Sequence, residues 1–182
     1  MSRWIAFLRA INVGGHTVKM ERLRRLFEAH GCTGVETYIA SGNVLFDAPE
    51  ADAHALKDHL ESALNEALGY KVSVFLRRPA ELAAIAVYAA FKAGELESAA
   101  ALNVAFLSAA PDEEAQRKLM ALKTDIDDFH VHGRQVYWLC RKRQSESTFS
   151  NAALERALGQ PSTLRGIKTI RKMVKKYDLG AL

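Results

Sequence analysis

The sequence predicts an α+β fold made of two ferredoxin-like βαββαβ-type subdomains. The main observation is that short apolar, β-rich segments alternate with amphipathic helical segments in the order βαββαβ at the start of the chain. The second half repeats much of that element order without a strict sequence repeat. We expect a ferredoxin-like subdomain over residues 1–78 and a connecting helix and linker over residues 79–98. A second α+β subdomain with a basic C-terminal helix is expected over residues 99–182.

The first subdomain is predicted from hydrophobic period and from the residues that end each segment. Residues 3–11 form a short apolar segment that is followed by glycines, which is typical of a strand. The segment "MERLRRLFEAHG" has the period of an amphipathic helix and ends at Gly31. Two β-rich runs in "VETYIASGNVLFDAP" surround Ser41-Gly42-Asn43 and predict a hairpin. A second helix over "DAHALKDHLESALNEALG" ends at Gly69, and "YKVSVFL" predicts the last strand.

The second half begins with a predicted helix over about residues 80–90 and a linker that contains Gly94. The segment "LNVAFLS" predicts a strand, and Pro111 is expected in the first turn of a helix over "PDEEAQRKLMAL". A hairpin is expected in "DDFHVHGRQVYWLC", turning near Gly133. Ser150 is a suitable N-cap for a helix over "NAALERALG". The last helix has an apolar stripe that consists of Ile167, Ile170, Met173, Val174 and Tyr177.

One edge of the first sheet is a candidate binding site. In a ferredoxin-like sheet, strands 1 and 2 are parallel and strand 3 lies between them, so the end of strand 1 meets the strand 2–3 turn. The first helix starts at that edge, and its N–H groups and positive dipole end face the same space. The predicted ligand-binding residues are Arg9, Asn12, Gly14, Gly15, Lys19, Ser41, Gly42 and Asn43.

This set suits a small molecule that carries a phosphate or a carboxylate. Arg9 and Lys19 would supply charge, the glycines backbone N–H groups, and Ser41 and Asn43 orienting hydrogen bonds. A structural interpretation stays open beside it. Under that interpretation the two glycines form only a tight turn, and Ser41-Gly42-Asn43 only a hairpin. The spacing matches neither a Walker loop nor G-x-G-x-x-G.

Three motifs show a resemblance to a known family. The segments "AFLRAINVGG" and "YIASGNVLF" resemble a widespread bacterial domain-of-unknown-function family whose members carry L-R-[GA]-I-N-V-G-G and Y-I-x-S-G-N-V-x-F. The closing segment "FSNAALERALGQPSTLRGIKTIRKM" is similar to the end of that family, except that Gly166 and Ile167 replace its Asn-Trp pair. The resemblance implies two ferredoxin-like subdomains and carries no established activity.

The C-terminal region is basic. Residues 141–182 carry 10 Lys and Arg against 3 Asp and Glu, although the net charge of the whole chain is only +4. An anionic partner is one interpretation, and a solvated helix face or internal pairing with "DIDDF" is the other. A nucleic acid is the less favoured partner because the aromatic motifs of ferredoxin-like RNA binders are missing. The surface in question consists of Arg165, Lys168, Arg171, Lys172 and Lys175.

Other chemistry finds little support in the sequence. His130 and His132 share a strand face with Asp128, but a third ligand is not evident, so no metal or cofactor is predicted. No G-x-S-x-G elbow or His-Glu-x-x-His motif is present, and whether the protein is an enzyme stays open. A non-catalytic protein-interaction module is a further alternative, and the oligomeric state is not determined.

The location of the protein is predicted from absences in the sequence. The N-terminal apolar run is too short for a signal peptide, and no run is long enough to cross a membrane. Cys32 and Cys140 lie far apart and match no zinc or redox spacing, which favours reduced thiols. We therefore expect a cytoplasmic protein that does not bind membranes.

Overall fold

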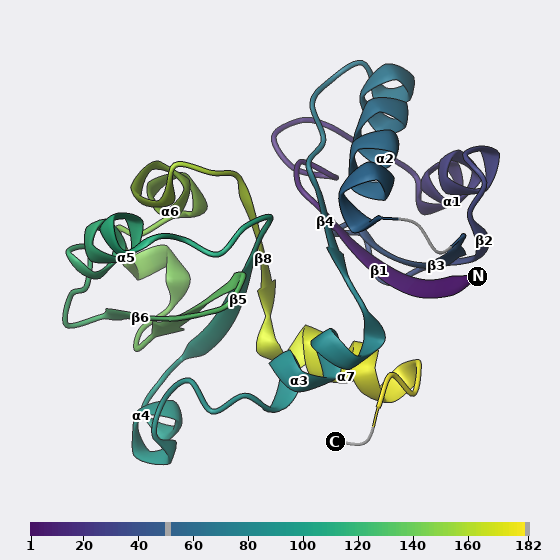
Figure 1. The fold of residues 1–182 in the computed structure, drawn as a ribbon. Helices are drawn as coiled ribbons and strands as arrows, with labels where there is room; N and C mark the ends of the chain where they lie inside the picture. The colour runs from purple at the N-terminus through teal and green to yellow at the C-terminus, as the bar shows by residue number, and fades with distance from the viewer. Residues whose placement is uncertain (50–51, 181–182) are drawn as a thin grey trace. The chain divides into compact units, whose positions relative to one another are not determined.

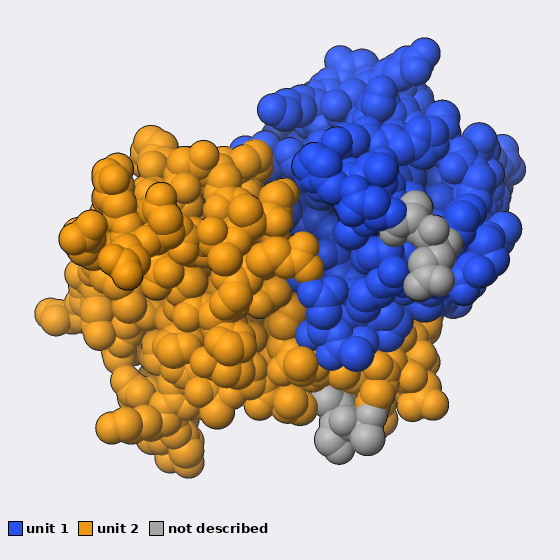
Figure 2. Space-filling model, in the orientation of Figure 1, with its two compact units in different colours: residues 1–82 blue, residues 83–182 orange. Residues whose placement is uncertain are grey.

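The computed structural model describes residues 1–49 and 52–180. The chain divides into two compact units, residues 1–82 and residues 83–182, which Figure 2 shows in different colours. None of the helices within the described ranges is long and apolar enough to cross a membrane.

Unit 1 is a four-stranded antiparallel sheet with two helices on one face. Its elements are β1 (Ser2–Leu8), α1 (Met20–Ala29), β2 (Thr33–Thr37), β3 (Asn43–Ala48), α2 (Ala53–Leu68) and β4 (Val74–Arg77), and α3 (Pro79–Val87) follows. The strand order is β2-β3-β1-β4, with β3 antiparallel to both β1 and β2. β1 and β2 are therefore parallel, as the ferredoxin-like prediction requires.

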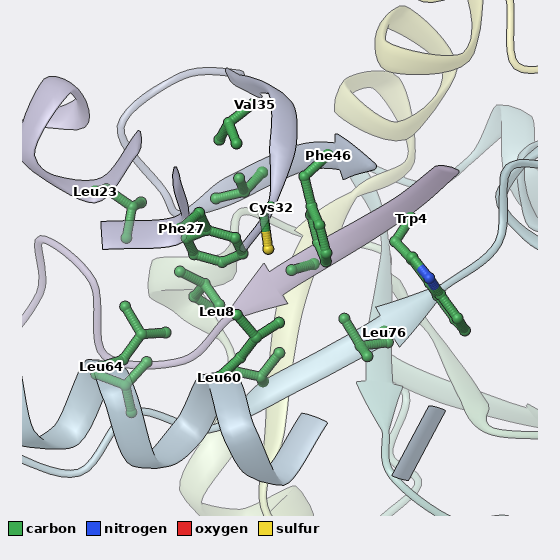
Figure 3. Packing of buried hydrophobic residues seen from close by; sticks show 14 of the residues in the cluster. Trp4, Leu8, Leu23, Phe27, Cys32, Val35, Phe46, Leu60, Leu64 and Leu76 are labelled. Atoms are coloured by element: carbon green, nitrogen blue, oxygen red, sulfur yellow. The ribbon is translucent and has the colours of Figure 1, made fainter. Parts of the chain in front are cut away.

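The core of unit 1 lies between the sheet and its two helices. Alternate residues of β1, including Ala6 and Leu8, point to the face that α1 and α2 cover. Phe27 of α1 and Leu60 of α2 pack in the same cluster, and Figure 3 shows both among the residues that surround Leu8. The helical period read from the sequence therefore selects the face that each helix buries.

Local signals set both ends of α2. Asp52 caps α2 by accepting hydrogen bonds from the backbone N–H groups of His54 and Ala55. Gly69 ends α2 in the left-handed conformation, with a φ of 77°, and its N–H donates to the carbonyl of Asn65. α1 is different because its N-cap, Lys19, makes no side-chain capping bond.

Unit 2 repeats the same topology. After the short helix α4 (Ala93–Glu97), its elements are β5 (Ala101–Leu107), α5 (Glu113–Met120), β6 (Asp127–His132), β7 (Gln135–Cys140), a 3-10 turn (Gln144–Glu146), α6 (Asn151–Leu158), β8 (Ser162–Gly166) and α7 (Ile167–Lys176). The strand order is β6-β7-β5-β8. The predicted fold class, α+β with two ferredoxin-like subdomains, is confirmed.

Several element boundaries differ from the prediction. β1 ends at Leu8 and does not reach residue 11, because Ala10 has a φ of 70°, which is incompatible with a strand. α5 begins at Glu113, and Pro111 precedes its N-cap; Asp112 caps the helix by accepting from the N–H of Ala115. Part of the expected linker forms α4.

Strand β8 was not identified from the sequence. Its segment "STLRG" is short and polar and shows no apolar alternation, so the β signal is weak. Ser162 is nevertheless fully buried. Its N–H donates to Glu155 and its carbonyl accepts from Asn151, so both backbone groups keep a partner away from water. Tertiary hydrogen bonds to α6 therefore compensate for a composition that does not favour a strand.

Candidate functional site

The end of β1 and the β2–β3 connection lie at the same edge of the unit 1 sheet. Phe7 pairs with Asn43 across β1 and β3, and the N–H of Leu8 donates to the carbonyl of Gly42 over 2.9 Å. One residue later, the N–H of Arg9 donates to the carbonyl of Ser73 over 3.0 Å. Two segments some thirty residues apart in sequence therefore meet at this edge.

Asn12 joins the two segments through its side chain. Its Nδ2 donates to the carbonyl of Val18 over 3.1 Å and to the carbonyl of Ala40 over 2.8 Å. Its Oδ1 accepts from the N–H of Val18 over 2.6 Å. The amide therefore fixes residues 12–18 against the β2–β3 connection, so its role at this edge is to hold the loop.

Gly14 and Gly15 form the tip of the loop. Their φ values are 60° and 85°, and the N–H of His16 donates to the carbonyl of Val13 over 3.1 Å. Positive φ at both central residues together with this bond is the pattern of a type I′ turn, which favours glycine at both positions. A Cβ at either glycine would meet no atom within 4 Å, so the backbone here is open to solvent.

Ser41, Gly42 and Asn43 serve the β2–β3 connection. Asn43 is fully buried, and its Nδ2 donates to the carbonyl of Tyr38 over 2.8 Å and to Ser41 Oγ over 3.0 Å. A Cβ at Gly42 would lie 3.0 Å from the Cβ of Ile11, and the φ of 82° at this position also favours glycine. The buried Asn43 side chain therefore stabilises the β2–β3 connection by hydrogen bonds to Tyr38 and Ser41.

Lys19 and His16 reach solvent at this edge, whereas the hydroxyl of Tyr70 does not. Lys19 is exposed at the start of α1, where no side chain caps the helix. The exposed ring of His16 stacks on Tyr70, with 3.7 Å between ring centroids. The buried hydroxyl of Tyr70 has no hydrogen-bond partner among the described residues, and burial raises the pKa of this phenol.

The sequence did not indicate the His16–Tyr70 pair. The two residues lie far apart in the chain, and neither belongs to a recognisable motif. Their contact depends on how the β1–α1 loop passes the end of α2, which no local pattern encodes.

The proposed basic surface divides in the structure. Lys168, Arg171, Lys172 and Lys175 are exposed on α7, whose apolar stripe, including Ile170 and Met173, is buried. Arg165 does not belong to this surface, because only 7% of it is exposed and its Nη1 donates to Thr163 Oγ1 over 2.8 Å. Burial lowers the pKa of its guanidinium to about 10.

Two of the three aspartates in "DIDDF", Asp127 and Asp128 at the start of β6, make internal contacts. Asp128 Oδ2 lies 3.7 Å from Arg141 Nη2 and 3.0 Å from Lys123 Nζ. Asp127 accepts from Trp138 Nε1 over 2.8 Å and from Ser147 Oγ over 2.7 Å. Asp128 therefore pairs with one cation of the basic region, and Asp127 is held by neutral donors in unit 2.

The two histidines of β6 contact a tyrosine. His130 Nε2 lies 2.9 Å from the hydroxyl of Tyr88, and the His132 ring stacks on Tyr88 with 4.0 Å between centroids. Among the residues that the structure describes, no group of three His, Cys, Asp or Glu side chains is arranged to hold a metal.

Comparisons with known proteins place the chain in a family. A solved structure of a conserved bacterial protein from Streptococcus pneumoniae is similar to it, with a TM-score of 0.75 and 23% sequence identity. That similarity covers 98% of this chain and 99% of the other, and at such an identity it shows the fold alone. No curated protein matches the chain. A family model described as "Protein of unknown function (DUF1697)" matches residues 1–137, so the chain belongs to this family of unknown function.

Proposed function

We propose that the protein binds a small molecule carrying a phosphate or a carboxylate at the β1–α1 edge. The observation that supports this most is the bridge from Asn12 to Val18 and Ala40. It holds an exposed loop in one conformation on a sheet edge, so the entropy cost of ordering the loop is met by folding and not by ligand binding.

The positive charge at this edge supports the binding of an anionic ligand. Lys19 is exposed at the uncapped start of α1, where the partial positive charge of the helix adds to its own. Glu21 also lies in the first turn, but it forms an ion pair with Arg25. The open backbone at Gly14 and Gly15 allows a ligand to approach closely. Arg9, half-buried at the end of β1, would supply the second positive charge.

A thermal-shift screen of the full chain with phosphorylated and carboxylated metabolites tests this proposal. We expect a subset to raise the melting temperature, and Lys19→Gln to weaken their binding by about tenfold because a charged hydrogen bond is lost. Arg24→Gln is the matched control, since it removes an exposed cation further along the same helix. Equal binding by Lys19→Gln and the parent protein would contradict the proposed site.

The exposed cations of α7 favour a second candidate function, nucleic-acid binding. Lys168, Arg171, Lys172 and Lys175 lie on one helix that has no acidic residue in its first turn. Such a surface would contact phosphates without reading bases, so retention on DNA or RNA should fall steeply as salt rises. Absence of retention at low salt would exclude this function.

We also propose that the protein works in a reducing compartment such as the cytoplasm. Both cysteines are unpaired and buried, so neither thiol depends on oxidation for the stability of its unit.

A further inference from the structure

Unit 2 contains a cavity of about 270 Å³ that the sequence did not indicate. Leu96 of α4 forms one wall, and residues 99–102, which lead into β5, form the next. The first turns of α7 complete it with Ile167, Lys168 and Arg171. Its volume is close to the lower end of the range for small-molecule sites in proteins.

The lining combines apolar walls with two cations. Besides Lys168 and Arg171, which lie three residues apart on one face of α7, the lining residues are leucines, alanines and one isoleucine. Arg171 is held in place because its Nε donates to the carbonyl of Ala86 over 3.0 Å. No acidic side chain lines the cavity among the residues that the structure describes.

The start of α7 adds to the positive potential. Gly166 is its N-cap and offers no side chain to the first N–H groups, and no acidic residue follows in the first turn. An anion in the cavity would therefore meet two side-chain charges beside the positive end of a helix dipole.

From this lining we propose that the cavity binds a small organic anion with an aliphatic body and one carboxylate. The carboxylate contacts Lys168 and Arg171, and the aliphatic chain lies against Leu96, Ile167 and the alanines. An apolar chain gains free energy by leaving water, and the two cations fix the end at which the carboxylate lies. The cavity uses no residue of the β1–α1 edge, so it goes beyond the function proposed above.

The lining residues of the cavity favour an aliphatic carboxylate over a nucleic acid. Single-stranded nucleic acids bind proteins by stacking bases on aromatic side chains, and no aromatic residue lines this cavity in the described part of the chain. Small aliphatic side chains favour an aliphatic ligand.

Titration of the full chain, followed by backbone amide NMR, tests the proposal with hexanoate as the probe. We expect saturable shifts at residues 99–102 and at Ile167 and Lys168, with far weaker effects from hexanol or inorganic phosphate. The double variant Lys168→Gln, Arg171→Gln should bind hexanoate about tenfold more weakly. Lys172→Gln, Lys175→Gln is the matched control, because it removes two exposed cations of the same helix outside the cavity.

A second variant tests the cavity itself. Ala100 is an exposed lining residue, so Ala100→Phe should fill part of the cavity and abolish hexanoate binding with an unchanged melting temperature. The proposal is overturned if hexanoate causes no saturable shift there, or if phosphate binds as tightly as hexanoate.

Two further arms separate the alternatives. An oligonucleotide that binds more tightly than hexanoate, and loses affinity equally with either double variant, would overturn the proposal in favour of a nucleic-acid surface. Lys19→Gln should leave hexanoate binding unchanged, so failure at the β1–α1 edge and failure here are distinguishable.

Discussion

Asn12 is the residue on which the order of the β1–α1 loop most depends. Its amide satisfies one N–H and two carbonyl groups of the backbone, and it does so at a φ of 53°. Asparagine tolerates this left-handed conformation better than any residue except glycine. The position therefore requires both the amide and the backbone preference of asparagine.

We predict that Asn12→Ala lowers the free energy of unfolding by about 2 kcal/mol, because three hydrogen bonds are lost and alanine is strained at positive φ. Urea denaturation measures this change. Asn12→Gly is the matched variant, because it loses the same three hydrogen bonds but is unstrained at positive φ, so its effect should be smaller. A stability of Asn12→Ala within about 0.5 kcal/mol of the parent would show that the bridge contributes little.

The structure shows which conformation Gly14 and Gly15 adopt. From the sequence, a ligand cradle and a tight turn were both open. The φ values and the His16–Val13 hydrogen bond establish the turn, and the open space above it leaves room for a ligand.

At the scale of elements, the helices could be predicted better than the strands. The period of α1 and α7 and the caps at Gly69 and Ser150 are local signals, and the structure contains them as expected. β8 was missed because its polar residues are buried only through bonds to α6. A strand that depends on distant partners leaves little trace in its own sequence.

The basic helix α7 shows the same division. Its amphipathic pattern predicted a buried stripe and a charged outer face, and both are present. The burial of Arg165 one residue before the helix N-cap could not be predicted, since arginine is mostly exposed in proteins. Strand alternation in β8 turns this side chain away from solvent.

At the scale of the whole molecule, the two units repeat one topology. In each unit a central strand pairs with the third and fourth strands, and a helix follows the fourth, α3 after β4 and α7 after β8. Arg77 lies opposite Ile5, and Arg165 lies opposite Val104, so the two arginines occupy equivalent register positions. The sequence contains no strict repeat, but both units carry Ala-Phe-Leu in the first strand (residues 6–8 and 105–107) and Leu-Arg in the last (residues 76–77 and 164–165).

Each unit also buries one thiol, which yields a prediction for the intact chain. Burial raises the pKa of Cys32 from 9.0 to about 11 and raises the pKa of Cys140 as well. Both groups are neutral thiols in the folded chain at pH 8, and a disulfide reagent reacts with thiolates. We expect neither cysteine to react at pH 8 until denaturant unfolds its unit; rapid labelling of the native protein would contradict the buried positions.

The raised pKa of Cys32 determines whether stability rises or falls with pH. Well below pH 9 both folded and unfolded chains keep the Cys32 proton, so this group leaves stability unchanged. Between pH 9 and 11 the unfolded chain loses the proton first, and stability falls as pH rises. Cys32→Ser, whose hydroxyl does not titrate in this range, should lack this component of the decrease in urea midpoint.

Period, capping and turn chemistry are local, so the fold class, the family motifs, several helix ends and the segments that meet at the β1–α1 edge can be predicted from the sequence. Which polar side chains hold the backbone and which face solvent depends on the folded chain: Asn12 and Asn43 bond the backbone, and Lys19 is exposed. Only the tertiary structure showed the His16–Tyr70 stack and the cavity beside α7. The physical reason is that side-chain partners and cavities depend on distances between segments remote in sequence, which no local pattern specifies.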